Sequence, residues 1–132
     1  MTSVDEWERV IDVNLTGVFR CAKHVGDQLL DRGASGSIVN IASMSGHIAN
    51  YPQPQAGYNA SKSGVAGLTR SLASEWATDG IRVNAIAPGY MRTEMVDSTL
   101  DDDPEMEELW LSDTPMDRLG QPSELAPVAV FL

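Results

Sequence analysis

Apolar residues recur at steps of three or four from residue 4 to about residue 31, which is the period of an amphipathic helix. Asp5 and Glu6 fall in its first turn, where carboxylates favour the positive end of the helix dipole, and Gly33 lies just past its end. The pattern therefore predicts one long helix. A polar amide, Asn14, falls on the same stripe and is expected to face the core. The apolar members of the stripe are Trp7, Ile11, Leu15, Val18, Ala22, Val25 and Leu29.

Two short β-branched runs, at residues 37–42 and 81–87, each end in a turn-forming region, which indicates buried strands. Between them, helical spacing runs from residue 58 to about residue 78, after a loop in which Pro52 and Pro54 exclude regular helix. A helix between two strands predicts a right-handed βαβ crossover and a parallel sheet. Because ligands bind at the carboxyl ends of parallel strands, residues 42–46 and 87–93 are expected to share one crevice.

The remaining third of the chain carries weaker signals. Residues 94–108 hold eight carboxylates and no basic residue, which predicts a mobile, partly helical acidic surface. A calcium site is disfavoured there, because the ligand spacing and central glycine of a calcium loop are absent. A last helix is expected from Pro122 to Leu132, where the chain is still apolar.

Composition limits the classes of function. The 132 residues suit one domain, and 9 basic against 19 acidic residues give a net charge of −10, which disfavours nucleic acid and membrane surfaces as partners. No apolar run is long enough to span a bilayer and the N-terminus is acidic, so a cytoplasmic protein is expected. Cys21 and His24 lack the further ligands of a metal site, so no metal is predicted.

Tyr58 and Lys62 stand four residues apart on a predicted helix and therefore project from the same face. An ammonium about 4 Å from a phenol would stabilise the deprotonated form by roughly 4 kcal/mol at intermediate dielectric. Such a tyrosine suits general acid/base catalysis. The pair alone is weak evidence, because the same spacing arises by chance on ordinary helix surfaces.

Further motifs favour a catalytic interpretation of the Tyr58–Lys62 pair, because their order along the chain resembles that of the short-chain dehydrogenase/reductase family. The stretches that carry the resemblance are Asn14-Leu15-Thr16-Gly17-Val18-Phe19, Ile38-Val39-Asn40-Ile41-Ala42-Ser43 followed by Gly46, Tyr58-Asn59-Ala60-Ser61-Lys62, Arg82-Val83-Asn84-Ala85-Ile86-Ala87-Pro88-Gly89 with Thr93, and Arg118-Leu119-Gly120-Gln121-Pro122. They extend over nearly the whole chain.

The resemblance implies hydride transfer between NAD or NADP and an alcohol or carbonyl substrate. Tyr58 would be the general acid/base, Ser43 would hydrogen-bond the substrate oxygen, Lys62 would assist Tyr58 and hold the nicotinamide ribose, and Asn14 would bind a water that links Lys62 to solvent. The residues implied in cofactor binding are Asn14, Tyr58, Lys62, Pro88, Gly89, Met91 and Thr93.

The segment from Ser45 to Gln55 is similar to that of the polyol and ketose branch of the family, which includes mannitol dehydrogenases and sorbose reductases. A polyol or ketose substrate is therefore expected, contacted by Ser45, His47, Asn50 and Gln55. The alternative is that these polar side chains satisfy backbone groups of their own loop, as is common in proline-containing loops.

A glycine-rich phosphate loop after a first strand, which a dinucleotide-binding fold requires, has no match in this sequence. The closest run, Gly33-Ala34-Ser35-Gly36, precedes a strand and is interpreted as a turn. The expected fold is thus α/β: residues 1–132 form one partial Rossmann-like domain, the second half of a doubly wound parallel sheet, without the glycine-rich N-terminal strands and the last strand. By itself this half is expected to be inactive.

Two functions stay open at this point. The first is a short-chain dehydrogenase/reductase that is a homo-oligomer, dimer or tetramer, when full length. The second is a truncated, non-catalytic relative that pairs with other copies through its two long helices, which in the family pack across a dimer interface.

An isolated 132-residue chain is expected to be unstable, because two strands without sheet neighbours leave unpaired edges. A thermal melt followed by circular dichroism should show a broad, concentration-dependent loss of structure. A sharp cooperative transition in dilute monomer would contradict this expectation.

Overall fold

The computed structural model describes residues 2–132. The chain forms two compact units, one reaching to Ala87 and including Leu132, the other comprising Pro88–Phe131. The first unit contains the sheet and two long helices, and the second contains four short helices. Each unit is described separately below.

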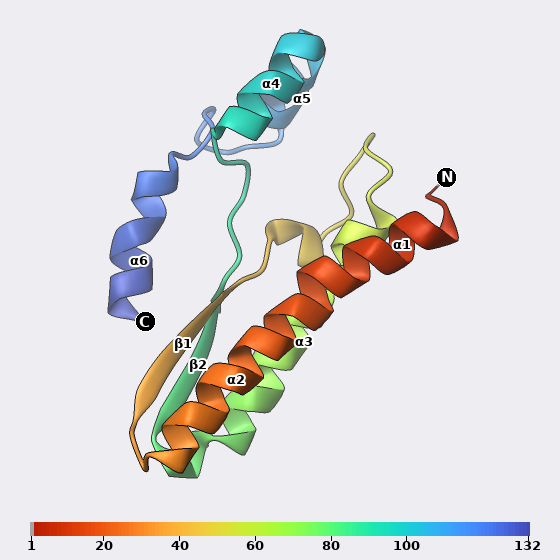
Figure 1. Ribbon diagram of the computed structural model, residues 1–132. Coiled ribbons are helices and arrows are strands. Elements are labelled where there is room, and N and C mark those ends of the chain that lie inside the picture. Colours follow the sequence, from red (N-terminus) through yellow and green to blue (C-terminus); the bar gives the residue numbers. More distant parts are fainter. Residues whose placement is uncertain (1) are drawn as a thin grey trace. The chain divides into compact units, whose positions relative to one another are not determined.

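The predicted N-terminal helix is confirmed and carries a local irregularity. It runs through α1 (Val4–Ile11), a π-helical turn η1 (Asp12–Thr16) and α2 (Gly17–Asp31) without a break (Figure 1). In the π turn the amide of Gly17 donates to the carbonyl of Asp12, five residues back. Asn14, Thr16 and Gly17 are weak helix formers, so this is where an α-helical pattern is least favoured.

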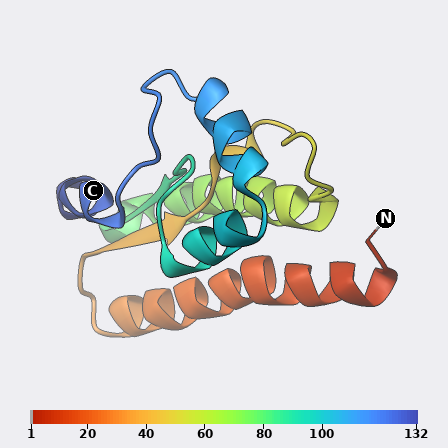
Figure 2. The ribbon, with the colours of Figure 1, turned by 90° about the horizontal axis from the view of Figure 1, so that it is seen from above.

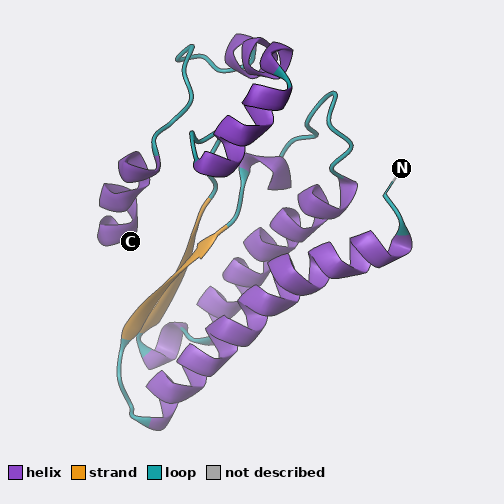
Figure 3. Ribbon diagram, turned by 45° about the horizontal axis from the view of Figure 1, so that its top comes forward, coloured by secondary structure: helices purple, strands orange, loops and turns teal. Residues whose placement is uncertain are grey.

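The sheet has the predicted parallel topology. Strands β1 (Gly36–Ile41) and β2 (Ile81–Ile86) pair in register from Gly36 opposite Ile81 to Ile41 opposite Ile86 (Figure 3). The crossover between them contains η2 (Met44–Gly46), α3 (Ala56–Glu75) and η3 (Ala77–Asp79). Gly80 then turns the chain into β2 with a φ of 74°, a value that glycine adopts without strain. Both strands thus end at the same edge of the sheet.

Helices α2 and α3 lie side by side along the sheet (Figures 1 and 2). Their contact is close because Gly26 faces the indole of Trp76, where a Cβ would lie 2.5 Å from a ring carbon. The core of this unit is formed by Ala22, Leu72, Ile81 and Val83, with Leu29, Ile38, Leu68, Ala73 and Trp76 packed around them. Burial of this apolar surface is the main source of stability for the unit.

Burial of the two strands differs from the expectation. In β2, Ile81, Val83 and Ile86 are buried as predicted. In β1 only Asn40 is buried, and Ile41 is 49% exposed, so the prediction of a buried strand is wrong for β1. The reason is that α3 packs mainly against β2 and covers β1 much less.

A buried polar contact joins β1 to α3. The Asn40 side chain donates from Nδ2 to Thr69 Oγ1 over 2.9 Å, and Thr69 Oγ1 donates to the carbonyl of Val65 over 2.8 Å. Both side chains are 7% exposed. The buried amide nitrogen is thereby hydrogen-bonded, as buried polar groups in folded proteins usually are.

The second unit contains α4 (Glu94–Asp102), α5 (Pro104–Ser112), η4 (Pro122–Leu125) and α6 (Ala126–Phe131). Its core consists of Leu100, Trp110 and Leu119, and the ring of Tyr90 stacks on Trp110 with centroids 4.3 Å apart. The predicted partly helical character of the acidic segment is confirmed. Within the described residues, every helix is too short or too polar to cross a membrane.

Substitution Thr69→Val should weaken the link between β1 and α3. Valine has a similar shape but leaves the Asn40 amide without its buried acceptor, which costs about 1–3 kcal/mol. Native-state hydrogen exchange should show that amount of lost protection in α3. Thr78→Val, at an exposed position, is the matched control and should leave the exchange unchanged. Equal protection in both variants would contradict a stabilising role for this contact.

Candidate active site

Ser43 lies two residues beyond the carboxyl end of β1 and is 8% exposed. Its Oγ accepts a hydrogen bond from the backbone N–H of Ser45 over 3.1 Å and so caps the short helix η2. This cap holds the Ser43 side chain in one orientation. Ser45, whose N–H donates this hydrogen bond, is buried in the same turn.

The turn that carries Ser43 packs directly on the backbone of α3. A Cβ built at Gly46 would lie 2.7 Å from the carbonyl carbon of Lys62, so only glycine fits this contact. The hydroxyl of Ser63 donates to the carbonyl of Gly46 over 2.6 Å. Ser43 and the first turns of α3 are therefore held together at one end of the sheet.

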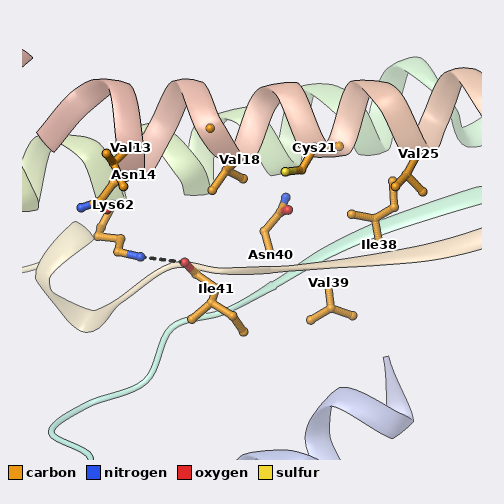
Figure 4. A pocket seen from close by; sticks show the side chains of 12 residues that line it. Val13, Asn14, Val18, Cys21, Val25, Ile38, Val39, Asn40, Ile41 and Lys62 are labelled. Carbon is orange, nitrogen blue, oxygen red and sulfur yellow. Dashed lines mark hydrogen bonds between the residues drawn. The ribbon is translucent and has the colours of Figure 1, made fainter. Parts of the chain in front are cut away.

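Tyr58 and Lys62 lie on adjacent turns of α3, as their spacing predicts. The Nζ of Lys62 is 5.6 Å from the centre of the Tyr58 ring. The same Nζ donates to the carbonyl of Ile41, the last residue of β1, over 3.0 Å (Figure 4). Partial burial lowers the pKa of Lys62 from its ordinary value of 10.5, because removing water disfavours the charged amine. The ammonium is thus fixed between the end of β1 and the ring of Tyr58.

Asn14 reaches this region from the π turn. Its Nδ2 donates to Ser61 Oγ over 3.3 Å, and the hydroxyl of Ser61 donates to the carbonyl of Tyr58 over 2.7 Å. Asn14 is half-buried, which confirms that this amide faces inward from the helix stripe. All four side chains predicted to take part in catalysis therefore belong to the first unit. Tyr58 and Lys62 lie on α3, Asn14 is hydrogen-bonded to Ser61 of α3, and Ser43 caps the turn that packs against the backbone of α3.

A pocket runs along β1 beneath η1 and α2 (Figure 4). Asn14 and Lys62 lie at one end of it, and Val25 and Ile38 lie at the other. Ile38 and Asn40 point toward α2, whereas Val39 and Ile41 point the opposite way (Figure 4). The polar side chains are thus collected at the end nearest the carboxyl terminus of β1.

The residues predicted to meet the nicotinamide after β2 belong to the second unit. Pro88 and Met91 are half-buried, and Gly89 and Thr93 are exposed. Met91 forms an isolated parallel bridge with Gly120, and Thr93 Oγ1 accepts from the N–H of Val96 over 3.3 Å. The Thr93 hydroxyl therefore caps α4 in this structure. Its contact with a cofactor stays a prediction.

The side chains predicted to contact substrate lie around the loop between η2 and α3. His47 is exposed, and Asn50 and Gln55 are half-buried. Gln55 stands at the N-cap position of α3, but its side chain forms no capping bond. The loop is tied to α3 where Asn59 Nδ2 donates to the carbonyl of Ile48 over 3.4 Å. The substrate roles of these residues stay predictions.

Sequence reasoning assigned no role to two groups in this site. Ser61 could have been noticed, because a serine three residues after Tyr58 on a helix can donate back to that residue's carbonyl. The carbonyl of Ile41, which accepts from Lys62, has no signal in the sequence, since every residue carries a carbonyl.

The sequence model of a protein family described as "Enoyl-(Acyl carrier protein) reductase" matches residues 1–132. A galactitol 2-dehydrogenase from Rhizobium johnstonii is 52% identical over 127 residues, which are 96% of this chain and 49% of that protein. The chain belongs to the short-chain dehydrogenase/reductase family. The resemblance read from the motifs is confirmed.

A further relative and two solved structures are also similar to this chain. An NADP-dependent mannitol dehydrogenase from Hypocrea jecorina is 48% identical over 130 residues, covering 98% of this chain and 47% of that protein. The crystal structure of gox2181 superposes with a TM-score of 0.94 at 47% identity, covering 99% of this chain and 50% of that one. A 4-hydroxyisoleucine dehydrogenase complexed with NADH gives a TM-score of 0.90 at 35% identity, covering 98% of this chain and 52% of that one.

The chain spans about half the length of the curated relatives it matches. These solved structures confirm the α/β, Rossmann-like class of the fold, of which this chain contains a two-stranded parallel part. Among residues 2–132, no three His, Cys, Asp or Glu side chains are grouped as they would be in a metal site.

The pKa of Lys62 can be measured by NMR in the full-length protein, where the resonance that is lost in Lys62→Gln identifies this side chain. The ¹³Cε resonance of labelled Lys62 should titrate with a midpoint below 10.5 in the folded protein. Between that midpoint and 10.5 the unfolded chain binds more protons than the folded one, so this group makes the free energy of unfolding rise with pH in that window.

In concentrated urea the midpoint should return to the ordinary value, because the desolvation is lost on unfolding. A folded-state midpoint at or above 10.5 would contradict the burial argument.

Proposed function

We propose that this chain is the catalytic half of an NAD(P)-dependent oxidoreductase that transfers a hydride between nicotinamide and an alcohol or carbonyl substrate. The single observation that carries the proposal is the position of the Lys62 ammonium, held by the carbonyl of Ile41 and adjacent to the ring of Tyr58. A fixed ammonium beside a phenol is an arrangement suited to general acid/base catalysis by that phenol. Ser43 lies two residues beyond the end of β1 and supplies a hydroxyl.

In the reducing direction Tyr58 gives its hydroxyl proton to the substrate oxygen while the carbonyl carbon gains a hydride, so that C=O becomes CH–OH. The hydroxyl of Ser43 hydrogen-bonds the same oxygen and stabilises the negative charge that develops on it. Lys62 stabilises the phenolate left on Tyr58 until a proton is returned from solvent. In the oxidising direction each of these proton movements is reversed.

The donor set fits a nicotinamide nucleotide. When bound, the reduced nicotinamide would supply the hydride, which carries both electrons of the reduction, and the oxidised nicotinamide would accept it. Lys62 and Tyr58 are half-buried side chains with polar hydrogens, which suits binding of ribose hydroxyls. Pro88, Gly89, Met91 and Thr93 are proposed to meet the carboxamide, and Asn14 to hold the water that links Lys62 to solvent. Relatives named for NADP and for NADH support both cofactors equally.

We propose a polyol or ketose as the substrate. The relatives named as galactitol and mannitol dehydrogenases support this class. In this chain the segment between Ser43 and α3 carries His47, Asn50 and Gln55, which follow Ser43 by 4, 7 and 12 positions. Imidazole and amide groups can both donate to and accept from sugar hydroxyls, as recognition of several adjacent hydroxyls requires.

The exposed surface of the long N-terminal helix supports association between copies of the protein. The helix formed by α1 and α2 leaves large apolar side chains in solvent: Trp7 is 41%, Phe19 42% and Val25 46% exposed. We propose that the full-length enzyme is a homo-oligomer that uses this helix. The same surface supports the second function, a non-catalytic relative that pairs through its helices. A measurement of catalytic activity distinguishes the two functions.

Substitution Tyr58→Phe in the full-length protein tests the enzyme hypothesis. Loss of the general acid should lower kcat for ketose reduction by about 10²–10⁴. Steady-state absorbance of NADH or NADPH at substrate saturation measures this. Tyr90→Phe is the matched control, since it removes a hydroxyl from a tyrosine whose ring stacking with Trp110 is retained.

Cofactor binding, followed by quenching of tryptophan fluorescence, should persist in Tyr58→Phe and shows that the variant is folded. Undiminished turnover by Tyr58→Phe would refute the assigned proton transfer. Absence of turnover in the unsubstituted protein with every polyol and ketose tried, together with stable self-association, would favour the non-catalytic function.

A further inference from the structure

Ser61 is a polar side chain at a position of complete burial. Its exposure is 0%, and only Ile81 and Val65 share this degree of burial among the larger side chains of the described residues. A hydroxyl there must be hydrogen-bonded, and it is: it accepts from Asn14 Nδ2 and donates to the carbonyl of Tyr58. We propose that Ser61 is a positioning residue for catalysis, acting through Asn14. This rests on the proposed function.

The hydroxyl of Ser61 decides which way the Asn14 amide faces. A serine hydroxyl has one hydrogen to donate, and that hydrogen is used by the carbonyl of Tyr58. Only lone pairs are left for Asn14, so the amide must turn its Nδ2 toward Ser61 and its Oδ1 away. The Asn14 side chain is thereby held in one orientation, and with it the π turn is tied to the part of α3 that carries Tyr58 and Lys62.

The contact falls at the irregular turn of the long helix. The π turn interrupts regular spacing at Asp12–Thr16, and Asn14 is its central residue. One residue later the side chain of Leu15 packs over Gly64, where a Cβ would lie 2.7 Å from a Leu15 methyl carbon. The polar contact at Ser61 and the apolar contact at Gly64 thus fix the π turn against α3, one turn apart.

A second contact between an asparagine and a hydroxyl of α3 provides a comparison with a purely structural role. Asn40, Thr69 and the carbonyl of Val65 repeat the same pattern of amide, hydroxyl and helix carbonyl two turns further along α3. That contact joins β1 to α3 and is remote in sequence from Tyr58 and Lys62. Thr69→Val should therefore lower stability without changing the pH dependence of the reaction.

The experiment uses the full-length protein and compares Ser61→Ala, Asn14→Ala and the double variant, with Thr69→Val and Ser71→Ala as controls. Ser71 lies on α3 in an exposed position. Ser61→Ala is expected to lower kcat about tenfold, the effect of losing one hydrogen bond on the reacting geometry, with KM for the cofactor changed less than about twofold. Its pH profile of kcat should match that of Asn14→Ala.

The double variant should be no slower than the slower single variant, because residues that act through one another do not add. In parallel, ¹⁵N-asparagine NMR should show the Asn14 side-chain amide as slowly exchanging in the parent and rapidly exchanging in Ser61→Ala. This readout does not depend on turnover.

Additive losses in the double variant, or a Ser61→Ala enzyme with the kcat and pH profile of Ser71→Ala, would overturn the proposal while Tyr58→Phe stays inactive. Full turnover by Tyr58→Phe is the distinct result that removes the proposed function, and it removes the catalytic role of Ser61 as well.

Discussion

Parallel pairing of β1 with β2 is the constraint on which the rest of the first unit depends. Two parallel strands cannot be joined by a tight turn, so the chain must leave the carboxyl end of β1 and return along the sheet before β2 begins. The return path is α3, whose first turn consequently lies next to the end of β1. A helix that starts near the end of a strand brings the turn after Ser43 against the part of α3 that carries Tyr58 and Lys62, although Tyr58 follows Ser43 by 15 positions in the sequence.

The charge on Lys62 shows how this arrangement balances opposing effects. Partial burial lowers its pKa, which by itself would favour the neutral amine. A carbonyl oxygen and the face of an aromatic ring both attract a cation, and the Lys62 Nζ lies next to one of each, the carbonyl of Ile41 and the ring of Tyr58. The carbonyl is available because β1 ends there. The end of β1 thus fixes the position of Lys62.

Polar groups also determine how the elements are held together. On α3, the hydroxyls of Ser61 and Thr69 each donate a hydrogen bond to their own helix and accept one from an asparagine of a neighbouring element. One asparagine comes from the π turn and the other from β1. Such bonds contribute modestly to stability but are directional, so they fix the rotation of α3 about its axis. That rotation decides where Tyr58 points. In the second unit, Arg92 has the same function, bridging Asp97 of α4 and Glu107 of α5.

The long N-terminal helix, the parallel βαβ unit and the shared helix face of Tyr58 and Lys62 could be predicted from the sequence, because periodicity, turn residues and motif spacing are local signals. The sequence also indicated that Asn14 faces inward. Three features come from tertiary structure: β1 is half-exposed, the Ile41 carbonyl accepts from Lys62, and Ser61 joins Asn14 to Tyr58. These are contacts between residues 21 and 47 positions apart, and one of them is made by a backbone group that every residue possesses. Contacts of that kind depend on how helices and strands are brought together, which no local pattern encodes.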